Sequence, residues 1–119
     1  MITLNMASEP HWLDLGHGVR VHVKPCTTAV MMAARAEVQR NTVADLSEPE
    51  AAGLRAAELI KTLGKLAILD WEGVGGVEGE PLAITPNGID ALLDLWPMAD
   101  AFERFYLGPV LLLDDEKNA

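Results

Sequence analysis

The residues best suited to hold a metal lie near the start of the chain: His11, His17, His22 and Cys26. Imidazole nitrogens and thiolates are the usual ligands of structural zinc, which needs four of them in a tetrahedron. Alternating apolar and polar residues around them predict a β-hairpin, with His11 and His22 on opposite faces and His17 on the turn. No two of these histidines have the i, i+4 spacing of a helical ligand pair, and the thiol stands alone. We therefore expect no metal site.

Nucleophilic catalysis lacks a suitable residue. Ser8 and Ser47 have no nucleophile-elbow context, and Ser47 with Glu50 three residues later is better explained as a helix capping box. A cysteine nucleophile needs a histidine base. Cys26 follows Pro25, which ends a predicted strand, and a lone cysteine in that place is more often a small core residue. We expect no catalytic residue, and the chain is not expected to be an enzyme.

Acid–base catalysis needs one carboxylate of a pair to be desolvated. Glu78 and Glu80 flank a Gly-rich turn, where water should reach both, and Asp90 and Asp94 share the polar side of a predicted helix. The pair Asp114 and Asp115 lies in a charged tail. Solvated carboxylates are therefore expected at all three places.

The glycines between residues 73 and 79 do not form a phosphate-binding motif. Their spacing matches neither the Walker loop nor G-x-G-x-x-G, no lysine follows, and glutamates surround them. We interpret the segment as a turn, and we expect no cofactor and no cofactor-binding residue.

Composition and charge limit the class of protein. The chain has 119 residues, half of them hydrophobic, and is expected to form a single domain over 1–119. Its formal net charge of −9 is uneven, with four basic and three acidic residues in 1–40 and five and fifteen in 41–119. Phosphate backbones would repel such a chain, so we expect no nucleic-acid partner. The acidity either keeps an apolar-rich protein in solution or matches a basic partner.

Targeting signals are also not apparent. No apolar run approaches the roughly 20 residues that span a bilayer, so no membrane partner is expected. The first ten residues lack the pattern of a signal peptide. One cysteine cannot form an internal disulfide, which favours a reducing, cytoplasmic setting.

The pattern of elements predicts an α+β fold, with an N-terminal β-hairpin, about four helices and a short Gly-rich hairpin between the second and third helices. In the first hairpin, cross-strand partners should sum to 34, so that Asp14 faces Arg20 and Trp12 faces His22. Gly64 should weaken the second helix by about 1 kcal/mol relative to Ala. The predicted ranges are 11–24 for the hairpin, 28–69 for a helical pair, 71–84 for the short hairpin, 86–107 for two short helices and 110–119 for a tail.

Local signals set the helix ends. Thr27 or Thr28 should cap the first helix, and Thr85 followed by Pro86 should open the third. Pro97 should end or bend that helix. Gly108 followed by Pro109 should stop the last one.

Two features are candidates for a partner surface. Aromatic residues mark the last helix, and such stripes are usually core, although aromatics also anchor interfaces. The apolar run that follows either folds back as an edge strand or offers a strip to another chain. The candidate partner-binding residues are Trp96, Phe102, Phe105, Tyr106, Val110, Leu111, Leu112 and Leu113.

From Trp71 onward the chain resembles the tail assembly chaperones of long-tailed bacteriophages and of gene transfer agents. The resemblance covers roughly 11–109, and includes the hairpin and an Ala-rich helix. One departure is Asn87-Gly88 after Thr85-Pro86, where the family often has an acidic residue; this should weaken the helix start. The motif residues are Trp71, Gly73, Val74, Gly79, Pro81, Thr85, Pro86, Leu92, Leu93, Phe102 and Tyr106.

The resemblance implies a non-enzymatic role. Such a chaperone coats the tape-measure protein, helps to recruit tail-tube subunits, is absent from the mature particle and often has a longer frameshifted form. A homo-oligomer stays open. Two alternatives also stay open: a structural component of the tail or virion, and an acidic antitoxin-like binding protein.

Overall fold

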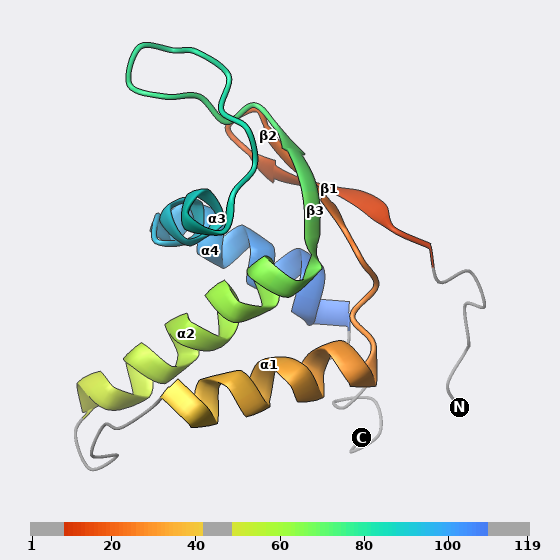
Figure 1. The fold of residues 1–119 in the computed structure, drawn as a ribbon, viewed down its shortest axis with the longest axis vertical. Coiled ribbons are helices and arrows are strands. Elements are labelled where there is room, and N and C mark those ends of the chain that lie inside the picture. Colours follow the sequence, from red (N-terminus) through yellow and green to blue (C-terminus); the bar gives the residue numbers. More distant parts are fainter. Residues whose placement is uncertain (1–8, 42–48, 110–119) are drawn as a thin grey trace.

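The computed structural model describes residues 9–41 and 49–109, which form an antiparallel sheet and helices in an α+β arrangement (Figure 1). The sheet has three strands in the order β1-β2-β3. In chain order the elements are β1 (His11–Gly16), β2 (Val19–Val23), α1 (Thr28–Asn41), α2 (Pro49–Ala67), β3 (Ile68–Glu72), α3 (Pro86–Leu93), α4 (Trp96–Phe102) and the π-helical turn η1 (Glu103–Leu107).

The β1–β2 hairpin has the predicted register. Trp12 pairs with His22 and Asp14 with Arg20, and a bulge follows at Gly16. The turn residues Gly16, His17 and Gly18 all have positive φ, of 85°, 56° and 78°. The alternation predicted that Leu13, Leu15, Val19 and Val21 face the core. Leu15, Val19 and Val21 are buried, whereas Leu13 is half-buried.

The third strand corrects the predicted helix end. The second helix was expected to reach Leu69, but it ends at Ala67, and β3 begins at once and pairs with β2. The apolar run there fits either a helix end or a strand. The segment forms a strand because β2, some fifty residues earlier in the chain, has unpaired backbone groups along its open edge, and β3 pairs with them.

The Gly-rich segment was expected to be a hairpin whose first strand was Trp71 to Val74. Trp71 pairs with Val21 of β2, and the Gly-rich loop of residues 73–85 extends beyond the sheet (Figure 1). Its two arms still meet through the backbone, because the Leu82 N–H donates to the Val74 carbonyl (3.1 Å). Within this loop the Gly76 N–H donates to the Glu80 carbonyl (2.8 Å). One isolated antiparallel bridge joins Gly75 and Pro81.

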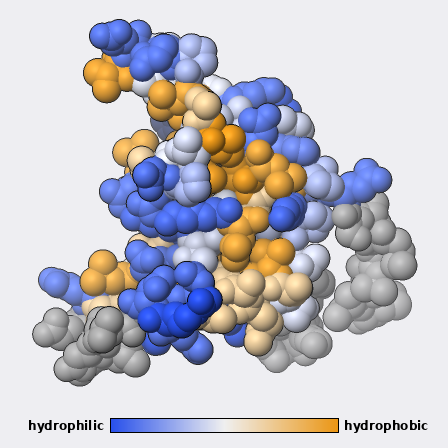
Figure 2. All heavy atoms as spheres, in the orientation of Figure 1, coloured by the Kyte–Doolittle hydropathy of each residue, from blue (hydrophilic) through white to orange (hydrophobic). Residues whose placement is uncertain are grey.

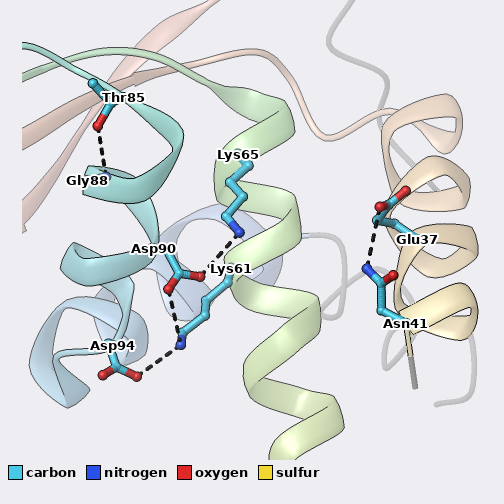
Figure 3. A network of polar contacts seen from close by, with 8 residues as sticks. All are labelled: Glu37, Asn41, Lys61, Lys65, Thr85, Gly88, Asp90 and Asp94. Carbon is cyan, nitrogen blue, oxygen red and sulfur yellow. Dashed lines mark hydrogen bonds and ion pairs between the residues drawn. The ribbon is translucent and has the colours of Figure 1, made fainter. Parts of the chain in front are cut away.

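Helix caps form where the sequence predicted them. The Thr27 hydroxyl accepts a hydrogen bond from the Val30 N–H (3.3 Å), and the Thr85 hydroxyl accepts one from the Gly88 N–H (3.0 Å; Figure 3). The chain leaves helical geometry after Leu93 and re-enters it at Trp96, just before Pro97. The Ser47 capping box lies outside the described residues.

Ion pairs join α2 to α3. The Lys61 ammonium lies 3.0 Å from a carboxylate oxygen of Asp94 and 3.8 Å from one of Asp90, and Lys65 lies 3.2 Å from the other oxygen of Asp90 (Figure 3). The hydrogen bond from Lys61 to Asp94 is the main reason that the lysine pKa is raised. Asp90 and Asp94 therefore hold two helices together, and Asp94 stays largely exposed, as predicted.

Candidate functional site

The structure separates the four described aromatic candidates into two pairs. Phe102 is fully buried and Tyr106 is 4 % exposed, and their rings stack 4.9 Å apart. Trp96 is 70 % exposed and Phe105 is 48 % exposed. Phe102 and Tyr106 are therefore core residues of this chain. Their burial corrects the prediction that they contact a partner. The candidates Val110, Leu111, Leu112 and Leu113 lie outside the described residues.

A change of helical winding explains why Phe105 leaves the core. An α-helix would place Phe105 beside Phe102, as the predicted stripe assumed. Residues 103–107 instead form a π-turn, with the Gly108 N–H donating to the Glu103 carbonyl five residues earlier. Its wider winding rotates Phe105 outward and brings Tyr106 under Phe102. The expected stop was also wrong, because Gly108 and Pro109 stay helical.

An apolar hollow of about 370 Å³ opens between the β1–β2 turn, the start of the Gly-rich loop and α4. Val19, Leu92 and Met98 are its buried lining residues, and Leu95, 57 % exposed, stands at its edge beside Trp96. The complete lining is His17, Val19, Gly73, Val74, Gly75, Leu92, Leu95, Pro97 and Met98. None of these residues carries a carboxylate, an ammonium or a guanidinium group.

The backbone of the Gly-rich loop closes one wall of this hollow. Gly73 has φ of 81° and packs so tightly on the backbone of Gly18 that no side chain would fit between them. The rim therefore depends on glycine at position 73, because only glycine combines positive φ with such a close approach.

A second hollow, of about 580 Å³, adjoins the first. His17 and Pro97 line both, so the two hollows lie side by side, and we call the pair the groove. The second hollow is lined by Asp14, Leu15, Gly16, His17, Pro97, Asp100, Ala101, Arg104 and Phe105. Figure 2 shows hydrophobic side chains gathered across the middle of the visible face, with hydrophilic ones above and below.

Charges occur only in this second half of the groove. The Asp100 carboxylate pairs with the Arg104 guanidinium (3.0 Å), one turn along the helix. Arg104 also lies over the Phe105 ring, 5.8 Å from its centroid. Asp14 accepts a hydrogen bond from the Gly16 N–H (2.8 Å) but has no ion pair with a described residue.

The residues that the sequence analysis considered for metal binding and acid–base catalysis do not form a common site in the described structure. His22 stacks on Trp12 with ring centroids 5.0 Å apart, and the Arg20 guanidinium lies 4.9 Å from the centre of the Trp12 ring. Glu78 and Glu80 are exposed. In residues 9–41 and 49–109, no cluster of three or more His, Cys, Asp or Glu side chains is placed to hold a metal ion.

Cys26 lies beside Tyr106 at the edge of the core. Burial is the main cause that raises the pKa of both the thiol and the phenol. The Tyr106 hydroxyl has no hydrogen-bond partner of good geometry among the described residues, although the thiol is close enough to affect its pKa. A thiol with a raised pKa is a poor nucleophile at neutral pH.

The sequence prediction missed most of the groove. It named Phe105, and Trp96 next to the groove, but not Leu95, His17 or Pro97. An exposed Leu-Trp pair directly before a helix-starting proline was the available signal. The other lining residues come from strands and loops far apart in the chain, and no local pattern relates them.

The fold is thus an α+β domain with a three-stranded antiparallel sheet and an open, mainly apolar groove. Comparisons with family models, with curated proteins and with solved structures returned no match to this chain. Among the described helices, none has the length and apolar character to cross a bilayer.

Proposed function

We propose that this chain is a polypeptide-binding protein that acts as a tail assembly chaperone of a phage or prophage in the bacterial cytoplasm. In this role it binds the tape-measure protein and helps to recruit tail-tube subunits. The observation that carries the proposal is the groove, an open and mainly apolar depression with the exposed side chain of Leu95 in its lining. The exposed Trp96 lies between the lining residues Leu95 and Pro97 in the chain.

The physical argument rests on what such a surface costs in water. The hydration of exposed Leu95 and Trp96 side chains is unfavourable, so a partner that covers them gains the free energy of their burial. Tryptophan is also among the residues that contribute most to protein interfaces. The resemblance to the chaperone family, over roughly 11–109, suggests the tape-measure protein as the partner, and the groove is the surface that we propose for it.

The test is co-expression of this chain with the tape-measure protein of the same phage or prophage. We expect the tape-measure protein to be found in the soluble fraction and to copurify with this chain. Trp96→Ala should weaken that binding by about tenfold or more, since a large exposed aromatic side chain next to the groove is lost. Trp96 is exposed, so the variant should fold, and circular dichroism checks this.

Val77→Ala is the matched control. Val77 is fully exposed on the Gly-rich loop and lines neither hollow, so its loss should leave binding unchanged. A tape-measure protein that stays equally insoluble with and without this chain would refute the proposal. Recovery of this chain from mature particles would favour the structural alternative, and tight binding to the product of an adjacent toxin gene would favour the antitoxin-like one.

A further inference from the structure

The two halves of the groove differ in chemistry in a way that specifies what fits them. The first half is apolar and uncharged, with Val19, Leu92 and Met98 buried in its lining. The second half has two carboxylates, from Asp14 and Asp100, and one guanidinium, from Arg104. The local charge of the second half is therefore negative. The whole chain is also acidic, with a formal net charge of −9.

The negative charge of the second half is only partly compensated. Arg104 pairs with Asp100, whereas Asp14 has no ion pair with any described residue. A carboxylate in that position attracts a cation of a bound segment, and the low-dielectric wall beside it strengthens the attraction.

Resting on the proposed function, we propose that the groove binds a client segment in which a large apolar side chain is closely followed by lysine or arginine. The apolar side chain occupies the first half, between Leu92 and Met98. The client cation occupies the second half, beside Asp14 and Asp100. Client segments that carry acidic residues at the same place are rejected because their charge repels both carboxylates.

Arg104 acts as an internal competitor in this arrangement. It holds the Asp100 carboxylate at 3.0 Å and covers the Phe105 ring, which are the two contacts a client cation would make. Removal of its charge should therefore tighten client binding. A residue that only stabilised the helix would not give this sign, because its loss could weaken binding but not strengthen it.

The test uses overlapping fluorescein-labelled peptides that tile the tape-measure protein, with binding measured by fluorescence anisotropy. The tightest peptides should carry lysine or arginine within a few residues of a large apolar side chain. Asp14→Asn should weaken their binding by about two- to fivefold, and Arg104→Gln should strengthen it by a similar factor. Asp14→Asn keeps an oxygen that can accept the Gly16 N–H, so the hairpin turn should persist.

The ion pair between Glu37 and Arg40 on α1 provides matched charge controls, because it is exposed and lines neither hollow. Glu37→Gln and Arg40→Gln change the net charge by the same amounts as the two test variants and should leave the affinity within measurement error. Salt between roughly 50 and 300 mM should weaken binding to the wild type more than binding to Asp14→Asn.

Several results would overturn this inference while leaving the proposed function intact. These are tight binding of peptides without basic residues, an unchanged affinity in Asp14→Asn, or weaker binding in Arg104→Gln. Self-association that Trp96→Ala abolishes would identify a second copy as the occupant instead. Peptide binding that appears only in a variant ending at Pro109 would identify residues 110–119 as the occupant. Failure of the full-length tape-measure protein to bind at all would refute the proposed function itself.

Discussion

At the scale of single residues, Tyr106 shows how an aromatic can be essential to the core and still carry an unfavourable group. Its ring stacks on Phe102, and it is 4 % exposed. Its hydroxyl has no well-aligned hydrogen bond among the described residues. A buried hydroxyl without a partner opposes folding, because it loses water without gaining an equivalent contact.

Tyr106→Phe should therefore raise the free energy of unfolding at pH 7 by up to about 1 kcal/mol. Burial raises the pKa of Tyr106 in the folded state, and an unfolded phenol titrates near pH 10. Ionisation of this group leaves the free energy of unfolding unchanged below about pH 10 and lowers it as the pH rises further, since the unfolded chain ionises first. Urea unfolding between pH 7 and 11 should show a smaller alkaline loss in Tyr106→Phe than in the wild type.

The alkaline loss should not vanish in that variant. The pKa values of Cys26 and Lys61 are also raised in the fold, Cys26 chiefly by burial and Lys61 chiefly by its hydrogen bond to Asp94. Both contributions have the same sign as that of Tyr106. An identical pH dependence in the two proteins would contradict the assignment of part of the loss to the phenol.

At the scale of elements, Trp71 connects the sheet, the Gly-rich loop and α3. It lies on β3, its indole N–H donates to the Leu82 carbonyl (2.8 Å), and its ring covers Gly88 of α3. A Cβ atom on Gly88 would come within 2.7 Å of the ring. The glycine that the sequence marked as a weak helix start is therefore the residue that lets α3 approach the sheet.

Gly88→Ala should lower the free energy of unfolding by about 1–3 kcal/mol, because the rigid indole is fixed by its hydrogen bond and cannot easily move aside. Gly53 of α2 is the matched control, since a Cβ atom there would contact nothing within 4 Å. Gly53→Ala should raise stability by about 0.5–1 kcal/mol through helix propensity alone. Urea denaturation followed by circular dichroism measures both, and changes of the same sign would contradict the close packing of Gly88.

At the scale of the whole molecule, strong acidity coexists with an exposed apolar groove. The net charge of −9 keeps copies of the chain apart at neutral pH. Near the sequence isoelectric point of about 4.6 that repulsion disappears, while the groove keeps its apolar surface.

Solubility should therefore be lowest near pH 4.6, and light scattering across pH 4 to 8 measures it. Trp96→Ala should scatter less than the wild type at that pH, because a large exposed apolar side chain is removed without a change of charge. Val77→Ala removes another exposed apolar side chain away from the groove. A decrease of the same size in Val77→Ala would show that general hydrophobicity, rather than the groove, drives association.

Much of the local structure could be predicted from the sequence. The register of the first hairpin, the Thr85 cap and the break before Pro97 each depend on residues within a few positions of one another. Strand alternation, capping hydroxyls and proline geometry act over that short range, so a linear pattern contains the needed information.

The tertiary structure alone decided the rest. β3 replaced the expected helix end because β2, distant in sequence, offered a strand edge to pair with. At the π-turn Phe105 is half exposed whereas Tyr106 is buried, and Gly88 is a contact point between α3 and Trp71. The groove joins the β1–β2 turn, the Gly-rich loop and α4, which meet only in the folded chain. Its surface depends on long-range packing, whereas the elements that border it depend on local chemistry.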